Sequence, residues 1–167
     1  MSLFKIALEV QKLLKPLNVL KELLSIAPLV FSPNGIETYA LDTNNTSGNH
    51  LRIRPEAFAI CEFPTAEQEF ACNIKIVELL KGLRMTDNDC FMIEITVATK
   101  DRSTLCLRLY GAGEREKSFE VKVQELGEGD EQYSMKPPEF VVATISVPLA
   151  PEDEHAKQGA FCFSEME

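Results

Sequence analysis

The sequence predicts an α+β domain in which an antiparallel sheet carries two helices on one face. Apolar residues recur at helical spacing in two separate segments, and short strand-like runs follow each of these segments. The runs succeed one another through turn-forming residues and need no parallel crossover of the doubly wound kind. A helix followed by strands therefore occurs twice within residues 5–123, which indicates a repeated supersecondary unit whose sheet halves pair.

The first predicted helix covers residues 8–24, where leucines recur at helical spacing with lysines among them. Pro16 removes a backbone donor inside this segment, so the helix should either kink there or begin its regular part there. We expect the best-formed part to follow Pro16. A hairpin comes next, because the Ser-Pro-Asn-Gly turn at 32–35 separates two short strands. The predicted strands of this half cover residues 29–31, 36–41 and 51–54.

The second predicted helix covers residues 72–83 and ends before the polar run at 86–89. Three strands follow, because β-branched and aromatic residues alternate with polar ones between turns. The Gly-Ala-Gly at 111–113 lies between two of these strands and lacks a following helix, so it indicates a hairpin turn and not a phosphate loop. These strands cover residues 91–97, 105–110 and 119–123.

The domain organisation follows from composition. Residues 1–123 form the first predicted domain, and residues 124–140, which are acidic and rich in turn formers, form a predicted linker. A strand at 141–147 would open a second domain, and the acidic tail after it completes the stretch 141–167. The sequence has no apolar run of 18 residues and no secretory signal pattern, so we expect neither a membrane partner nor export.

Net charge limits the class of partner. The formal net charge is -9 and the pI is about 4.8, so a chain that binds nucleic acid must gather its cations on one face. A cationic set does lie on or beside the two predicted helices, and it is a candidate DNA-facing surface; an ordinary solvated helix face explains the same pattern equally well. The set is Lys12, Lys15, Lys21, Lys75, Lys81 and Arg84.

Catalytic and metal chemistry have little support. The chain has two histidines, His50 and His155, which are too few and too poorly placed for a metal centre or a triad. We expect no cofactor, no metal and no enzymatic activity. One enzymatic alternative stays open, a cysteine-dependent hydrolase that would pair Cys72 with His50.

The order of segments resembles the proliferating cell nuclear antigen family of sliding clamps. The resemblance is carried by Leu-Asn-Val-Leu-Lys-Glu-Leu at 17–23, by the turn at 32–35, and by the strand Gly-Ile-Glu-Thr-Tyr-Ala-Leu-Asp at 35–42. Residues 74–109 resemble the second helix and following strands of the family, and 119–123 resembles the strand before its interdomain connector. The similarity spans about residues 4–150 and implies the DNA-clamp, or processivity, fold.

The resemblance also implies a function without chemistry: a processivity factor that tethers DNA polymerase and repair proteins to double-stranded DNA, without sequence preference. A clamp loader, self-association into an oligomer, and a nuclear or viral replication site follow from it. The helix cations would face the DNA phosphates. The partner-peptide groove would consist of Leu41, Asn45, Thr46, Leu126, Tyr133, Pro137 and Pro138. The subunit edge would consist of Ser118, Phe119, Glu120, Val121, Lys122 and Val123.

The sequence departs from the family pattern in two respects. Asn45 stands where the family has a histidine, so the specificity for partner peptides should differ. The partner half of the subunit interface has no counterpart, which indicates a truncated clamp, a fragment or a shortened relative. A protein-interaction or assembly module that kept the fold without DNA contact is therefore the main competing function.

Overall fold

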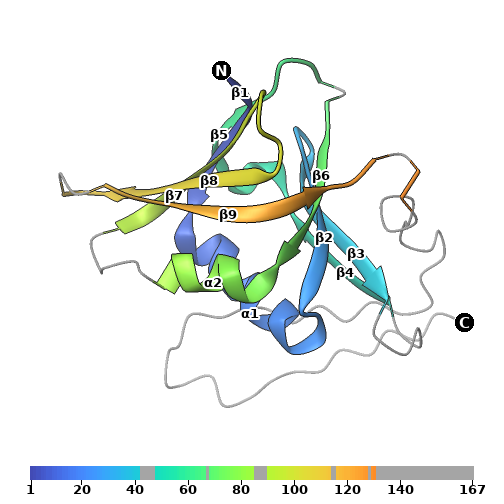
Figure 1. Ribbon diagram of the computed structural model, residues 1–167. Helices are drawn as coiled ribbons and strands as arrows, with labels where there is room; N and C mark the ends of the chain where they lie inside the picture. Colours follow the sequence, from blue (N-terminus) through green and yellow to red (C-terminus); the bar gives the residue numbers. More distant parts are fainter. Residues whose placement is uncertain (42–47, 67, 85–89, 114–115, 128, 131–167) are drawn as a thin grey trace, which may run out of the picture. The chain divides into compact units, whose positions relative to one another are not determined.

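The computed structural model describes residues 1–41, 48–66, 68–84, 90–113, 116–127 and 129–130. These residues form a nine-stranded sheet in the order β4-β3-β2-β6-β9-β8-β7-β1-β5, with two α-helices (Figure 1). Every strand pairing is antiparallel, so the predicted fold class is confirmed. The elements are β1 (Ser2–Glu9), α1 (Val10–Leu23), β2 (Ile26–Ser32), β3 (Gly35–Leu41), β4 (Gly48–Ile53), the 3-10 turn η1 (Pro55–Ala57), β5 (Phe58–Glu62), β6 (Phe70–Lys75), α2 (Ile76–Arg84), β7 (Cys90–Ala98), β8 (Thr104–Gly111) and β9 (Lys117–Glu125).

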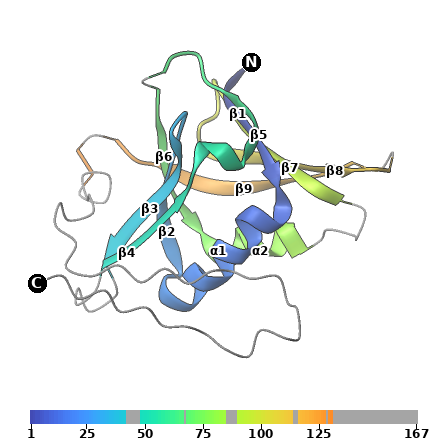
Figure 2. The same ribbon diagram turned by 180° about the vertical axis from the view of Figure 1, so that it is seen from behind.

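The predicted repeat is present as two units of the same element order, β1-α1-β2-β3-β4 and β6-α2-β7-β8-β9. The first strand of each unit joins the sheet of the other unit: β1 pairs with β7, and β6 pairs with β2. Strand β9 joins the two sheet halves, because it pairs with β8 along 117–122 and then with β6 along 123–125 (Figure 2). The repeated units are therefore interlocked.

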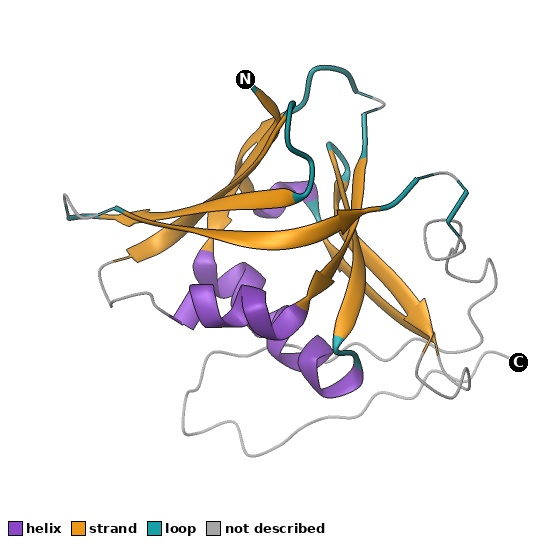
Figure 3. Ribbon diagram, in the orientation of Figure 1, coloured by secondary structure: helices purple, strands orange, loops and turns teal. Residues whose placement is uncertain are grey.

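Both helices lie side by side on one face of the sheet (Figure 3). Helix α1 buries Val10, Leu13, Leu17 and Leu20, which recur at helical spacing, and α2 buries Ile76, Leu79, Leu80 and Leu83 in the same way. The N–H of Ile76 donates to the carbonyl of Ser25 at 3.1 Å, so α2 begins beside the end of α1. Arg84 at the end of α2 donates to the side chain of Asn18 at 3.3 Å, so the two helices run in opposite directions.

An aromatic cluster forms the part of the core where the two sheet halves meet. Phe4 of β1 stacks on Phe31 of β2 at 5.3 Å between ring centroids and on Phe63 at 5.2 Å. Phe70 of β6 completes the cluster, 5.7 Å from Phe4. Phe4, Phe31 and Phe70 are each only 2 % exposed, so the cluster ties the first strand of the chain to the opposite half of the sheet.

The predicted turn at 32–35 is present between β2 and β3. Gly35 has a φ of 138°, a conformation that side chains with a Cβ rarely adopt. A Cβ at this position would also collide with the carbonyl oxygen of Ile53 on the following hairpin strand. Glycine is therefore required here both by the turn and by the close approach of the neighbouring backbone.

Two expectations about the helices were wrong. The predicted second helix began at Cys72, whereas residues 72–75 belong to β6 and α2 begins at Ile76. The apolar residues of β6 fit the spacing of a helix and of a buried strand equally well. The segment forms a strand because it pairs with β2 over its whole length. Helix α1 also runs unbroken from Val10 through Pro16, because Val10 and Leu13 are buried in the core before the proline.

Other differences concern the ends of elements. Strands β1 and β5 were not predicted, and β9 continues two residues past the predicted end at Val123. The N–H of Leu126 then donates to the carbonyl of Ala71 at 2.8 Å, so the chain stays attached to β6 beyond the predicted start of the linker. By contact density the chain divides into residues 1–137 and 138–167. Residues 138–167, which include the predicted strand at 141–147, lie outside the described residues.

Candidate nucleic-acid interface

The structure brings all six cations of the candidate DNA-facing set onto the helix layer. Three of them belong to α1, Lys75 is the last residue of β6 immediately before α2, and Lys81 and Arg84 belong to α2. Every one of the six is exposed. Because α1 and α2 pack side by side, residues more than 60 positions apart in the sequence share one surface (Figure 3).

Three of these cations have an acidic neighbour on their own helix or at the residue that precedes it. The ammonium Nζ of Lys12 lies 3.2 Å from a carboxylate oxygen of Glu9, and that of Lys81 lies 3.2 Å from Glu78, both at i,i+3 spacing. Lys21 lies 3.3 Å from Glu22. Such exposed pairs contribute only about 0–1 kcal/mol to folding, because water and salt screen them.

Lys15 and Lys75 differ from these three. Among the described residues, no carboxylate oxygen lies within 4 Å of either ammonium group. Arg84 binds the neutral amide of Asn18 and not a carboxylate. Half of the cationic set therefore has no acidic partner among the residues that the structure describes.

The helix layer is positive in an otherwise acidic chain. Residues 9–24 and 75–84 contain six cations and the three carboxylates Glu9, Glu22 and Glu78, which gives a local charge of +3. The formal net charge of the whole chain is -9, so the remaining residues sum to -12. This segregation is the electrostatic arrangement that a polyanion-binding face requires.

The same layer exposes apolar side chains. Val19 and Leu23 of α1 are 61 % and 46 % exposed, and Val77 of α2 is 46 % exposed. Isolated exposed apolar residues are common on soluble proteins, but these three lie on the two helices that carry the cations. The surface is thus both basic and partly apolar.

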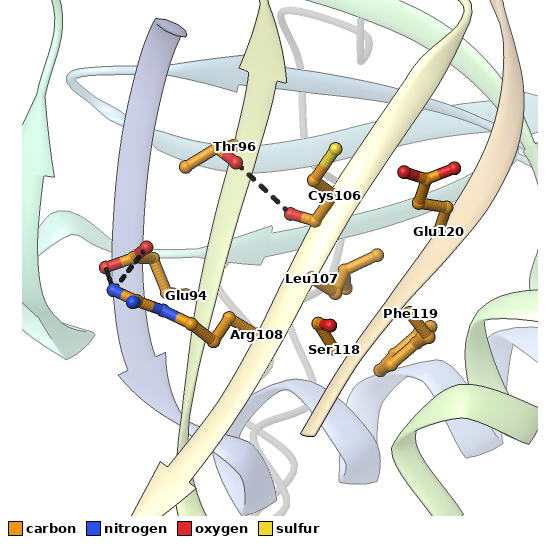
Figure 4. Close-up of a pocket in the computed structure, with 8 residues that line it drawn as sticks. All are labelled: Glu94, Thr96, Cys106, Leu107, Arg108, Ser118, Phe119 and Glu120. Carbon is orange, nitrogen blue, oxygen red and sulfur yellow. Dashed lines mark hydrogen bonds and ion pairs between the residues drawn. The ribbon is translucent and has the colours of Figure 1, made fainter. Parts of the chain in front are cut away.

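A second charged cluster, which the sequence did not reveal, lies on β1, β7 and β8. The carboxylate of Glu94 accepts two hydrogen bonds from Nη2 of Arg108, at 2.9 and 3.1 Å (Figure 4). It also lies 3.2 Å from Nζ of Lys5. Its side chain is only 11 % exposed. The hydrogen bond and charge of Glu94 raise the pKa of Arg108 above its ordinary value. The cross-strand pairing of Glu94 with Arg108 was the available signal, but it depends on strand register.

A depression of about 510 Å³ lies beside this cluster and includes Cys106, Ser118 and Glu120 among its lining residues (Figure 4). Burial raises the pKa of the Cys106 thiol, and the nearby carboxylates of Glu120 and Asp101 raise it further. A thiol of this kind is a poor nucleophile. The Glu94 carboxylate is already held by two cations, so the depression presents no activated catalytic group.

The predicted subunit edge lies on β9. Its residues 118–122 pair with β8 on one side, and among the described residues no strand pairs with them on the other side. Val123 is different, because it pairs with Ile74 of β6. The ring of Phe119 packs against Gly82 of α2, where a Cβ would collide with it.

The predicted peptide groove is only partly described. Leu41 ends β3 and is half-buried, and Leu126 follows β9 and is 6 % exposed. Strands β2 and β6 lie between β3 and β9 in the sheet, so no strand pairing joins these two residues. Asn45, Thr46, Tyr133, Pro137 and Pro138 lie outside the described residues.

The structure opposes the hydrolase alternative. Cys72 is fully buried, and burial together with the charge of Glu125 raises the pKa of its thiol to about 12. His50 lies on β4, and β3 and β2 separate β4 from the β6 strand that carries Cys72. A thiolate that needs a nearby histidine base is therefore not available at this position.

Within the described residues, no group of three or more His, Cys, Asp or Glu side chains could hold a metal ion. The helices in that part of the chain are all too short or too polar to cross a bilayer.

Comparisons with known proteins agree with the fold. A search of curated proteins found no match. Among solved structures, the crystal structure of proliferating cellular nuclear antigen from Entamoeba histolytica superposes with a TM-score of 0.71 at 20 % sequence identity, over 87 % of this chain and 55 % of that one. The chain thus spans about half the length of this clamp. The family model described as proliferating cell nuclear antigen, N-terminal domain, matches residues 3–132, and the chain belongs to this family.

Proposed function

We propose that this chain is a sliding-clamp-type domain that tethers polymerase and repair proteins to double-stranded DNA. The observation that supports this function best is the charge of the helix layer, which is +3 in a chain of net charge -9. Membership of the sliding-clamp family supports the same function at a coarser level. The proposal requires no catalytic group, since tethering depends on contact and topology.

Phosphate contacts from mobile lysine side chains suit this function. Lys and Arg contacts to the phosphates carry no sequence information, and they exchange between neighbouring phosphates with little change in energy. Contacts of this type are salt-dependent and allow a protein to slide. The exposed cations of α1 and α2 have the required chemistry.

Assembly and partner binding belong to the same proposal. One side of Ser118–Lys122 pairs with no strand of the described part of the chain, so it could pair with a strand of another subunit, which would close an assembly around DNA and cover the edge. Leu126 and the residues predicted with it would bind short peptides with aromatic anchors from DNA polymerase and other partners. A clamp loader, and a nuclear or viral replication site, accompany this function.

The test of DNA tethering is fluorescence anisotropy of a labelled duplex over a series of KCl concentrations. One variant replaces Lys12, Lys15, Lys75 and Lys81 with Gln; its matched control replaces Arg52, Arg54, Lys100 and Arg102, four exposed cations outside the helices. We expect binding at low salt that the helix variant loses and the control keeps. Equal loss in both variants would assign the binding to net charge alone and contradict the proposal.

The test of the peptide groove is calorimetric titration with a clamp-binding peptide that carries paired aromatic anchors. We expect micromolar binding that the Leu126→Ala, Pro138→Ala double variant abolishes. Because Leu126 is buried, a thermal melt must show that the variant folds; Leu41→Ala, at a less buried position, serves as a second variant. Absence of binding at high peptide concentration would restrict the resemblance to the fold.

One observation favours the assembly-module alternative, in which the fold is kept without DNA contact. Val19, Leu23 and Val77 expose apolar surface on the helix layer, where a protein partner would bury it. Under this alternative, the wild type self-associates and does not bind DNA. The double variant Val19→Ser, Val77→Ser should then lose the self-association, as measured by sedimentation velocity. Under the proposed function, the same variant keeps salt-dependent DNA affinity.

A further inference from the structure

We infer that the six helix cations are unequal: Lys15, Lys75 and Arg84 provide most of the salt-dependent DNA contact, while Glu9, Glu22 and Glu78 weaken the contribution of the other three lysines. This inference rests on the proposed function and assigns roles within its site. It follows from which cations have carboxylate neighbours in the structure.

A lysine that is paired with a carboxylate gains less binding free energy from a DNA phosphate than a lysine without such a partner. Lys12 and Lys81 each lie 3.2 Å from a carboxylate oxygen, so the pair has no net charge when viewed from a phosphate several ångströms away. Binding DNA through either lysine requires exchange of one anionic partner for another. Counterion release, which drives association with DNA, is correspondingly smaller.

Lys15 has no such competitor on its helix. Its nearest acidic residues along the chain are Glu9, which precedes α1, and Glu22, six and seven positions away. These separations correspond to about 9 and 10.5 Å along the helix axis, roughly one Debye length at 0.1 M salt, so both carboxylates are largely screened from Lys15. Lys75, at the junction of β6 and α2, has no carboxylate within 4 Å among the described residues.

The consequence is a weak and mobile interface. Glu9, Glu22 and Glu78 reduce the formal charge of the helix layer from +6 to +3 without removing a single cation. A tethering surface must not hold one stretch of DNA too tightly, because strong phosphate contacts oppose sliding. These three glutamates are therefore attenuating residues, which act on DNA through the lysines beside them.

The experiment measures duplex affinity by fluorescence anisotropy over a series of KCl concentrations with the full chain. We compare two variants of equal charge, Lys15→Gln with Lys75→Gln and Lys12→Gln with Lys81→Gln. Each phosphate contact contributes about 0.9 to the slope of log affinity against log salt. The first variant should lower the slope by about 2, and the second by less than about 1.

The reciprocal variant neutralises the attenuating residues. Glu9→Gln with Glu78→Gln should raise affinity by roughly three- to tenfold at 0.1 M salt, because Lys12 and Lys81 then have no carboxylate competing with the DNA phosphates. The matched control, Glu56→Gln with Glu62→Gln, changes the net charge equally at exposed positions outside both helices and should change affinity by less than about twofold. Thermal melts check that every variant is folded.

The outcomes separate the two proposals. If neither the wild type nor any variant binds the duplex even at low salt, the proposed function fails and the inference fails with it. If the wild type binds but the two lysine variants lose the same slope, or if Glu9→Gln with Glu78→Gln behaves like its control, the inference is overturned and the proposed function stands.

Discussion

The two interlocked units share an order of elements but hold their helices in different ways. Helix α1 is 14 residues long and contains Pro16, whereas α2 is nine residues long and contains Gly82. Gly82 is buried against the ring of Phe119, so this side chain of β9 reaches the backbone of α2. Pro16 is half-buried, and α1 is held by the leucines around it. The shared topology thus tolerates a proline inside the helix of one unit and requires a glycine in the helix of the other.

Charge pairs also differ between the units. Glu94 and Arg108 lie opposite each other on β7 and β8, and Glu37 and Arg52 lie opposite each other on β3 and β4. The Glu94 side chain is 11 % exposed and that of Glu37 is 35 % exposed. The same cross-strand pair is therefore a structural element in the second unit and a surface contact in the first.

The largest expected effect tests the contact that both units share. Phe4→Ala removes the ring that stacks on Phe31, Phe63 and Phe70, so it should lower the free energy of unfolding by about 3–5 kcal/mol. Chemical denaturation measures the change. Val19→Ala, at an exposed position, is the control and should change stability by less than about 0.5 kcal/mol. A loss below about 1 kcal/mol for Phe4→Ala would show that the cluster does not join the units.

The next effect separates the two charge pairs. Arg108→Ala leaves a mostly buried carboxylate with Lys5 as its remaining cation, and it should cost about 1–2 kcal/mol. We place it below the cost of a fully buried pair because the side chain of Arg108 is itself 46 % exposed. Arg52→Ala should cost less than about 0.5 kcal/mol, since its pair with Glu37 is exposed. Equal costs in urea denaturation would remove this distinction between the units.

The third prediction compares two alanine variants, one in each helix, which should change the free energy of unfolding in opposite directions. In Gly82→Ala the added Cβ collides with Phe119, and overpacking of about 1–3 kcal/mol exceeds the gain of about 1 kcal/mol in helix propensity. In Pro16→Ala a backbone donor returns to the middle of α1, which should stabilise the chain by about 1 kcal/mol after the greater entropy of the unfolded chain is included. Thermal melts of both variants measure whether each substitution raises or lowers the stability. Stabilisation by Gly82→Ala would mean that α2 moves away from β9 without cost.

The sequence predicted what local periodicity controls. The spacing of the buried residues of α1 predicts a helix, and the turn at 32–35 is clear because only glycine suits the backbone of Gly35. Strand β6 was mistaken for helix because its period is ambiguous and only its pairing with β2 resolves it. Element ends at β9 and Leu126 likewise depend on contacts with a distant strand.

The candidate site was predictable in position but not in electrostatics. Helical spacing is enough to assign five of the six cations to the two helices, which pack together. Lys75 lies on β6, where a helix was predicted, and it joins the others because α2 begins at the next residue. Which cations have carboxylate partners depends on side-chain geometry, as the contrast between Lys15 and Lys81 shows. The cluster around Glu94 required the register of β1, β7 and β8, which no local pattern supplies.

The proposed function requires that DNA contact the helix layer. Lysine acylation followed by mass spectrometry, with and without duplex DNA at low salt, tests it directly. We predict protection of Lys15 and Lys75 in the helix layer, while Lys100 in the turn between β7 and β8 and Lys122 on β9, both exposed, react at unchanged rates. Protection of Lys100 and Lys122 with unchanged helix lysines, or equal protection of all four, would show that the helix layer is not the DNA-binding face.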